Sequence, residues 1–197
     1  MLRRLIGLMG SKENAFIFEV KTAAADEDFI LPLESGGTYD FTVDWGDGST
    51  NDITTYNDAN VTHTYASAGT HDVTITGTIT GWYFNNSASA PKVYEISSWS
   101  NFALVPDSGS TFYGCSNMTW TGSAVGGFDT ALVENMAQMF YLCTAFNQSV
   151  SNFDTAKVTN MSVMFGNCTA FNQSVSNFDT AKVTNMFRMF RDCIAFN

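Results

Sequence analysis

The sequence predicts a mainly β chain with short helices, in which a β-sandwich is followed by a solenoid of 25-residue coils. Two observations support this fold class. The first half alternates apolar and polar residues between turn signals, and the second half repeats one phrase at a fixed spacing. Because 197 residues can hold two small domains, each with its own core, the change of pattern predicts two structural units.

Residues 16–96 show the alternation of half-buried strands. The stretch "THDVTITGTIT" (70–80) places His71, Val73, Ile75, Gly77 and Ile79 on one face, and "TYDFTVDW" (38–45) does the same with Tyr39, Phe41, Val43 and Trp45. The turn signals "ESGGT", "WGDGST", "YNDAN" and "ASAGT" separate such segments. Short strands with these turns predict an antiparallel sandwich of roughly immunoglobulin type.

Two phrases in this region also resemble a known module. The turn "WGDGST" (45–50) and the later "HTYASAGTHDVTI" (63–75) are similar to the two halves of the PKD-domain motif. The resemblance implies a β-sandwich that acts as a spacer or a binding domain in extracellular proteins.

The acidic turn has two interpretations. Asp44, Asp47 and Asp52 are weak candidates for a calcium site, because Ca²⁺ binds several oxygens that converge on one loop. The simpler interpretation, which we favour, is that Asp-Gly tolerates the positive φ of a hairpin turn. His63 and His71 have no metal-ligand spacing from a cysteine or a carboxylate pair, so we expect them to pack or to form hydrogen bonds.

Residues 97–127 are predicted to be a linker and a degenerate capping repeat. Aromatic residues are frequent from Gly81 onward, and "FYGCSNMTW" (112–120) loosely matches the repeat that follows. Stacked repeats need such an atypical end to protect the first interface.

Residues 128–197 form the repeat array, whose last unit is incomplete. Cys143, Cys168 and Cys193 are 25 residues apart, and Cys115 precedes Cys143 by 28. Aligned in this way, equivalent residues predict a structural ladder, made of Cys143, Cys168 and Cys193, of Asn135, Asn160 and Asn185, and of Phe146, Phe171 and Phe196. A period of 25 lies within the range of leucine-rich-repeat-like solenoids.

Each coil is expected to have an extended side with one brief strand and a short side that is either helical or a turn. "VTNMSVMFGNC" (158–168) spaces its apolar residues by three and four, with Thr159 as a cap, and "AFNQSVSNF" (170–178) suggests the strand. Asn amides are expected to satisfy backbone groups at corners and to pair with the Asn of the next coil.

The cysteines and methionines are interpreted as core residues. Without a C-x-x-C motif, buried thiols are favoured over a metal site, and helically spaced methionines are more often core than copper ligands. Disulfides between adjacent coils remain open, because coils about 4.8 Å apart could be bridged under oxidation.

The wording "FNQSVSNFDTAKVTNMSVMFGNCTAFNQ" resembles the BspA-like repeat, a mycoplasma-type repeat of unknown function grouped with leucine-rich-repeat surface proteins. The match covers residues 128–197 closely and residues 112–120 loosely. The resemblance implies display on a bacterial, protist or phage surface, with adhesion or host recognition as the activity.

Composition excludes several classes of protein. A net charge of −10 argues against nucleic-acid binding, and no apolar run reaches the length of about 20 residues that a membrane span needs. Residues 1–15 do not have the pattern of a secretion signal, and we expect a docking or frayed segment there. No catalytic motif is present, so we expect neither an enzyme nor a cofactor.

These features predict a non-enzymatic structural or adhesion protein. We favour a phage virion fibre or decoration protein, located on the virion surface, over a secreted bacterial adhesin. Protein partners within an assembly, a homo-oligomer, and a host protein or glycan are the partners such a role implies. Positions that vary between repeats are candidates for ligand contact, and they include Gln138, Ser162, Val163, Arg188 and Arg191.

A coil that ends at "CIAFN" without a polar cap would expose an apolar face. We therefore expect the array either to continue in a longer protein or to be covered by a partner.

Overall fold

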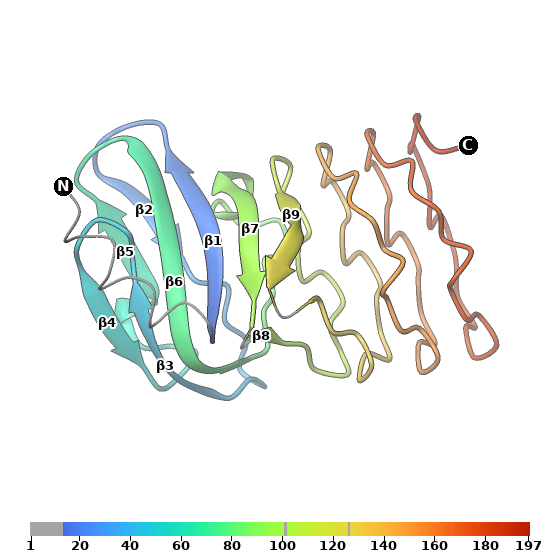
Figure 1. Ribbon diagram of the computed structural model, residues 1–197, viewed down its shortest axis with the longest axis horizontal. Helices are drawn as coiled ribbons and strands as arrows, with labels where there is room; N and C mark the ends of the chain where they lie inside the picture. Colours follow the sequence, from blue (N-terminus) through green and yellow to red (C-terminus); the bar gives the residue numbers. More distant parts are fainter. Residues whose placement is uncertain (1–13, 101, 126) are drawn as a thin grey trace.

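The computed structural model describes residues 14–100, 102–125 and 127–197, so most of the segment 1–15 lies outside the described residues. One sheet dominates the N-terminal half (Figure 1). Its strands are ordered β4 (Thr50–Ile53), β3 (Tyr39–Asp44), β6 (Gly69–Thr80), β1 (Ala15–Thr22), β7 (Val93–Trp99) and β9 (Thr119–Val125), and β8 (Phe102–Ala103) pairs with β6. The pairs among β4, β3, β6, β1 and β7 are antiparallel, whereas β9 joins β7 and β8 joins β6 in parallel.

A second, smaller sheet packs on the first. It consists of β2 (Glu27–Ile30) and β5 (Thr62–Tyr65), which are antiparallel. Their buried Phe29 and Tyr65 share a core with the main sheet, where the Phe18 ring lies 5.9 Å from that of Phe29. The prediction of a mainly β chain is confirmed, and the only helices among the described residues are two single turns of 3₁₀ helix, η1 (Ala59–Val61) and η2 (Ala90–Lys92).

The alternation predicted for the central strands is present with one exception. Tyr39, Phe41 and Val43 of β3 are buried between exposed residues, and Val73 and Ile75 of β6 are buried in the same way. Gly77 is exposed instead of buried. Its φ is 124°, and a Cβ there would lie 2.4 Å from the carbonyl oxygen of Asp40, so the close approach of β3 requires glycine.

Successive 25-residue repeats lie side by side beyond the sheets (Figure 1). We call residues 128–152, 153–177 and 178–197 the first, second and third repeats. Residues 158–168 form consecutive turns and no helix, so the turn alternative for this side of the coil is the one found. The predicted strand over 170–178 is not formed. The described residues 127–197 contain only isolated parallel bridges, which link Asn135 to Asn160 and Asn160 to Asn185. Helical spacing of apolar residues therefore arises here from turns that bury every third or fourth side chain.

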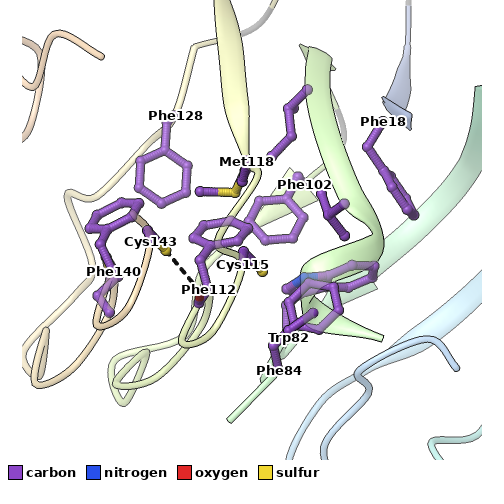
Figure 2. Packing of buried hydrophobic residues seen from close by; sticks show 14 of the residues in the cluster. Phe18, Trp82, Phe84, Phe102, Phe112, Cys115, Met118, Phe128, Phe140 and Cys143 are labelled. Atoms are coloured by element: carbon purple, nitrogen blue, oxygen red, sulfur yellow. Dashed lines mark hydrogen bonds between the residues drawn. The ribbon is translucent and has the colours of Figure 1, made fainter. Parts of the chain in front are cut away.

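The repeats join the sheets without a gap in the core. The N–H groups of Phe84 and Asn86 donate to the carbonyls of Thr111 and Tyr113, in the segment predicted to be a degenerate repeat. Figure 2 shows Trp82, Phe84 and Phe102 packed next to Phe112 and Phe128 at this junction. One buried cluster runs from Phe16 to Cys193, so the two halves share a single hydrophobic core.

Candidate binding surface

One row of backbone N–H groups connects each repeat to the next. In the second repeat Met161, Val163, Phe165 and Asn167 donate to the carbonyls of Asn185, Phe187, Met189 and Arg191 over 2.7–2.9 Å. The first repeat bonds to the second in the same way, through Met136, Gln138, Phe140 and Leu142. We call residues 136–142, 161–167 and 186–192 the turn segments. In these segments the bonds between repeats all run from an N–H to a carbonyl of the following repeat.

The intervening N–H groups bond within their own repeat. Met164 donates to Met161, Gly166 to Val163, and Cys168 to Phe165, at 2.9–3.2 Å, so the segment is a series of β-turns. Two residues per repeat have a positive φ, for example Val163 and Asn167, both at 57°. Asn and Asp tolerate this conformation, whereas a β-branched residue such as Val163 is strained in it. The alternation of inter-repeat and intra-repeat bonds replaces the bonding pattern of a helix.

Positions that differ among the repeats gather on the turn segments. We call positions 137, 138, 141 and 142, with their equivalents in the other repeats, the variable strip. Position 137 is Ala, Ser and Phe in the three repeats, and position 138 is Gln, Val and Arg. The N–H of Gln138 donates to the carbonyl of Ser162, and the N–H of Val163 donates to the carbonyl of Phe187. The variable strips of successive repeats therefore lie side by side along the array. The predicted contact residues Gln138, Ser162, Val163, Arg188 and Arg191 all belong to this strip and are partly or fully exposed. Gly166, which shares the strip and was expected to face outward with them, is buried.

The strip changes chemistry along its length. In the third repeat the Arg188 guanidinium lies 4.7 Å from the centre of the exposed Phe187 ring, and Arg191 pairs with Asp192 at 3.0 Å. Nearer the sheets, the rings of Tyr113 and Tyr141 lie 4.9 Å apart. The strip thus runs from an aromatic end to a basic end on a chain that is acidic overall.

A polar hollow adjoins the aromatic end, and the sequence did not point to it. Glu34 and Tyr83 line it from the sheet side, Asp107 lines it from the segment before the first repeat, and Asn135 and Gln138 line it from the first repeat. Burial, and secondarily the charge of Asp107, raises the pKa of Glu34. The lining residues are far apart in the sequence, so no sequence motif predicts this hollow. The alignment of Tyr113 with Tyr141 could have indicated which part of the surface the hollow adjoins.

The cysteines form a row of buried, free thiols. Cys143 donates to the carbonyl of Phe112 at 3.0 Å, as drawn in Figure 2, and Cys168 donates to Phe140 at 2.9 Å. Cys193 bonds Phe165 in the same way at 2.6 Å. Burial raises the pKa of all four thiols above that of an ordinary cysteine. Neutral, hydrogen-bonded thiols are poor nucleophiles and poor metal ligands.

The asparagine and phenylalanine ladders have different structural roles. The side-chain oxygens of Asn135, Asn160 and Asn185 each accept the N–H two residues later, at 2.9–3.0 Å, which closes the corner before the turn segment. Other asparagine side chains reach across repeats. Asn147 Oδ1 accepts the N–H of Asn172 at 2.9 Å, and Asn177 Nδ2 donates to the carbonyl of Val150 at 3.1 Å. The rings of Phe146, Phe171 and Phe196 stack in sequence at 5.9 and 5.7 Å.

The acidic turn of the sheets is already bonded within the protein. Asp44 accepts the N–H of Gly46, and Asp52 accepts the hydroxyl of Thr42. Asp47 accepts hydrogen bonds from the N–H and the hydroxyl of Ser49, and its Oδ2 lies 2.8 Å from His63 Nε2. Partial burial acts to raise the pKa of Asp47, but the bonds from Ser49 and His63 outweigh it and lower the pKa to about 2. Among the described residues no group of three or more His, Cys, Asp or Glu side chains is arranged to hold a metal ion.

The histidines pack as expected. His63 stacks on Trp45 with 4.6 Å between ring centres, and His71 stacks on Tyr65 at 3.8 Å. His71 also lies 3.2 Å from the hydroxyl of Thr22, and burial lowers the pKa of its imidazole. In the part of the chain that the structure describes, no helix combines the length and apolar character of a membrane span.

Comparison with known families matches both halves of the chain. A family model described as "Mycoplasma protein of unknown function, DUF285" matches residues 106–197, and the PKD domain model matches residues 19–81. No curated protein and no solved structure matches the chain. The resemblances to the PKD domain and to the mycoplasma-type repeat are therefore confirmed.

Proposed function

We propose that this chain, which combines a PKD domain with a DUF285 region, is a non-enzymatic surface protein whose variable strip binds a partner. Both families are typical of extracellular or surface proteins, and this class of location is the part of the proposal that the comparisons support directly. In the proposal, the repeats form a solenoid of leucine-rich-repeat type that holds the strip away from the PKD domain.

The position of the sequence differences is the observation that supports a binding role. Core residues such as Met136, Phe140 and Phe146 are identical in the next repeat and fully buried. The differences fall mainly on the exposed strip, where a substitution leaves the packing of neighbouring repeats unchanged. A fixed core with a changeable, continuous surface is the arrangement that repeat proteins use for recognition.

The layout of the two halves supports the proposal of a projecting role. The sheets lie at one end of the long axis and the repeats extend away from them (Figure 1). A phage fibre or decoration protein with host-binding repeats uses such a layout, and a secreted cell-surface adhesin uses it equally.

Fractionation distinguishes these two locations. An antibody against the protein should label intact purified virions if it is a fibre or decoration protein. Label on the envelope of uninfected cells, with none on virions, would reject the virion role and support the adhesin.

Binding through the strip is tested with a charge reversal. Fluorescent protein is incubated with a panel of bacterial cells, and binding of the double variant Arg188→Glu, Arg191→Glu is compared with that of Lys157→Glu, which changes charge outside the strip. We expect at least a tenfold loss of cell binding for the strip variant and little change for the control. Equal binding of both variants would contradict a role for the basic end of the strip.

A further inference from the structure

The polar hollow between the sheets and the first repeat has the size of a small-molecule site. Its volume is about 340 Å³. Sites for small ligands usually measure about 300–1,000 Å³, so the hollow matches a ligand at the small end of that range. Among the described residues that line it, Tyr83 carries the one aromatic ring, and most of the others are polar.

Hydrogen bonds within the protein hold two walls of the hollow in place. On the sheet side, the N–H of Glu34 donates to the hydroxyl of Tyr39 at 2.9 Å. On the other side, Asn135 Nδ2 donates to Asp107 Oδ1 at 2.8 Å. Walls that are fixed before a ligand arrives reduce the entropy lost on binding.

Several polar groups of the lining have little bonding inside the protein. In the part of the chain that the structure describes, neither the Glu34 carboxylate nor the Tyr83 hydroxyl has a hydrogen-bond or ion-pair partner. Ser110 is 5% exposed, and its hydroxyl lies 3.4 Å from Gln138 Oε1. An ordinary O–H···O bond measures about 2.5–3.0 Å, so this contact is weak. These groups are available to bond the hydroxyls of a ligand.

The charge of the hollow favours a cationic group. Glu34 and Asp107 supply two carboxylates, and no basic side chain is among the described lining residues. Burial, and after it the charge of Asp107, raises the pKa of Glu34. A positive charge placed between two carboxylates that repel each other stabilises both of them in the ionised form.

The tyrosine adds a feature that a simple cation does not need. Its side chain belongs to a residue that is 41% exposed. One face of a pyranose ring consists of C–H groups and packs on an aromatic ring, whereas the hydroxyls at its edge need donors and acceptors. The amide, hydroxyl and carboxylate groups around Tyr83 supply both kinds of partner.

We propose that the hollow binds an amino sugar, which is a saccharide with a free ammonium group. The ammonium group lies between Glu34 and Asp107, the sugar ring packs on Tyr83, and its hydroxyls bond Ser110 and Gln138. This site goes beyond the proposed function of the variable strip, because its carboxylates lie outside the strip and the basic end of the strip takes no part in it.

Titration with a defined oligosaccharide tests the proposal. The 197-residue protein is titrated by calorimetry with a glucosamine tetramer and, in parallel, with the same tetramer in its N-acetylated form. A pH of about 6 keeps amines charged and carboxylates ionised, and about 0.15 M salt screens exposed charges. We expect the tetramer with free amines to bind at least tenfold more tightly than the N-acetylated one.

Variants that remove one charge locate the contact. Glu34→Gln and Asp107→Asn keep the size of each side chain, and the asparagine retains an oxygen that can accept from Asn135. Each should weaken binding of the glucosamine tetramer at least fivefold. Asp40→Asn, which removes the same charge on the exposed face of β3, should leave the affinity unchanged.

Two further variants separate the sugar from its charge and the hollow from the strip. Tyr83→Ala should weaken binding of the tetramer at least threefold and leave binding of spermidine, a polyamine without a sugar ring, unchanged. The double variant Arg188→Glu, Arg191→Glu should bind the tetramer as the wild type does, even where it loses binding to cells. Loss of tetramer binding by this double variant would contradict the placement of the site in the hollow.

Three other results would overturn the proposal. The first is the absence of tetramer binding, and the second is equal affinity for the two tetramers. The third is displacement of the glucosamine tetramer by Ca²⁺ with the same dependence on Glu34 and Asp107, which would assign the hollow to a metal ion.

Discussion

The PKD domain and the repeats both contribute aromatic residues to one core, but the rings are arranged differently in the two regions. Around Trp82 the rings of Phe16, Phe18 and Phe84 meet it edge to face, at 76–89°. In the repeats, Phe140, Phe165 and Phe190 lie nearly parallel, at 4–5°. Isolated aromatic pairs adopt edge-to-face or offset stacks, and translation by one repeat allows only the parallel form.

The hydrogen bonds show the same difference. In the PKD domain β1 pairs with β6, more than 50 residues away for most pairs, so each strand has unique neighbours. In the repeats each turn segment meets its own equivalent 25 residues later. Stability in the repeats is therefore approximately a sum over neighbouring interfaces, whereas the sheets depend on long-range pairing.

The largest expected effect is on the free energy of unfolding, and it differs between the second and third repeats. Phe165→Ala should lower the free energy of unfolding by about 3–5 kcal/mol, because a fully buried ring stacked on both sides is lost. Phe190→Ala should cost distinctly less, since Phe190 is partly exposed. Urea denaturation of both variants measures the difference. Equal losses would contradict the expectation that the more deeply buried ring contributes more to stability.

Thiol labelling distinguishes the repeats at the level of single residues. Cys193 is 8% exposed and should react with a maleimide before Cys115, Cys143 and Cys168, which are fully buried. The buried three should react only through opening of the repeats, which costs several kcal/mol. Mass spectrometry of digests taken over time gives the order, and early labelling of Cys143 would contradict the buried ladder.

A buried hydrogen bond of the PKD domain provides a test on the sheet side of the molecule. The Tyr65 hydroxyl donates to the carbonyl of Trp45 at 2.9 Å. Tyr65→Phe leaves that carbonyl unsatisfied and should destabilise the protein by about 1–2 kcal/mol. Thermal denaturation measures the loss, with Tyr56→Phe, at an exposed tyrosine, as the control.

Acid should weaken the PKD domain through Asp47. Its pKa in the folded protein is about 2, below the ordinary value of 3.8, so the folded state favours the ionised form. The stabilisation is present above about pH 4 and is lost as the pH falls toward 2. The stability difference between the wild type and Asp47→Asn, measured by urea denaturation, should shrink over that range.

The smallest expected effect concerns calcium. The oxygens of Asp44, Asp47 and Asp52 have separate partners in the protein, so we expect millimolar Ca²⁺ to leave the melting temperature unchanged. Differential scanning calorimetry with Mg²⁺ as the control tests this. A rise specific to Ca²⁺ would restore the calcium-site hypothesis.

Much of the candidate surface could be predicted because the repeats reveal it by comparison with one another. Alignment alone identified the variable positions Ala137 and Gln138 and separated them from core positions such as Met136. The hollow at Glu34 and Asp107 could not be predicted, since it forms only where the sheets and repeats meet. The sequence left a helix or a turn open over 158–168, because apolar spacing of three and four fits serial turns as well as a helix.

The sequence by itself determined the change of pattern between the two halves, the strands around Val43 and Val73, the 25-residue register and the burial of the cysteines. These features depend on periodic patterns of residue type, which can be recognised in the sequence without knowledge of the fold. Only the tertiary structure decided the single direction of the backbone bonds between the turn segments of successive repeats. Which N–H groups point along the array depends on backbone angles such as the positive φ of Val163, and residue types that occur in helices and turns alike do not specify those angles.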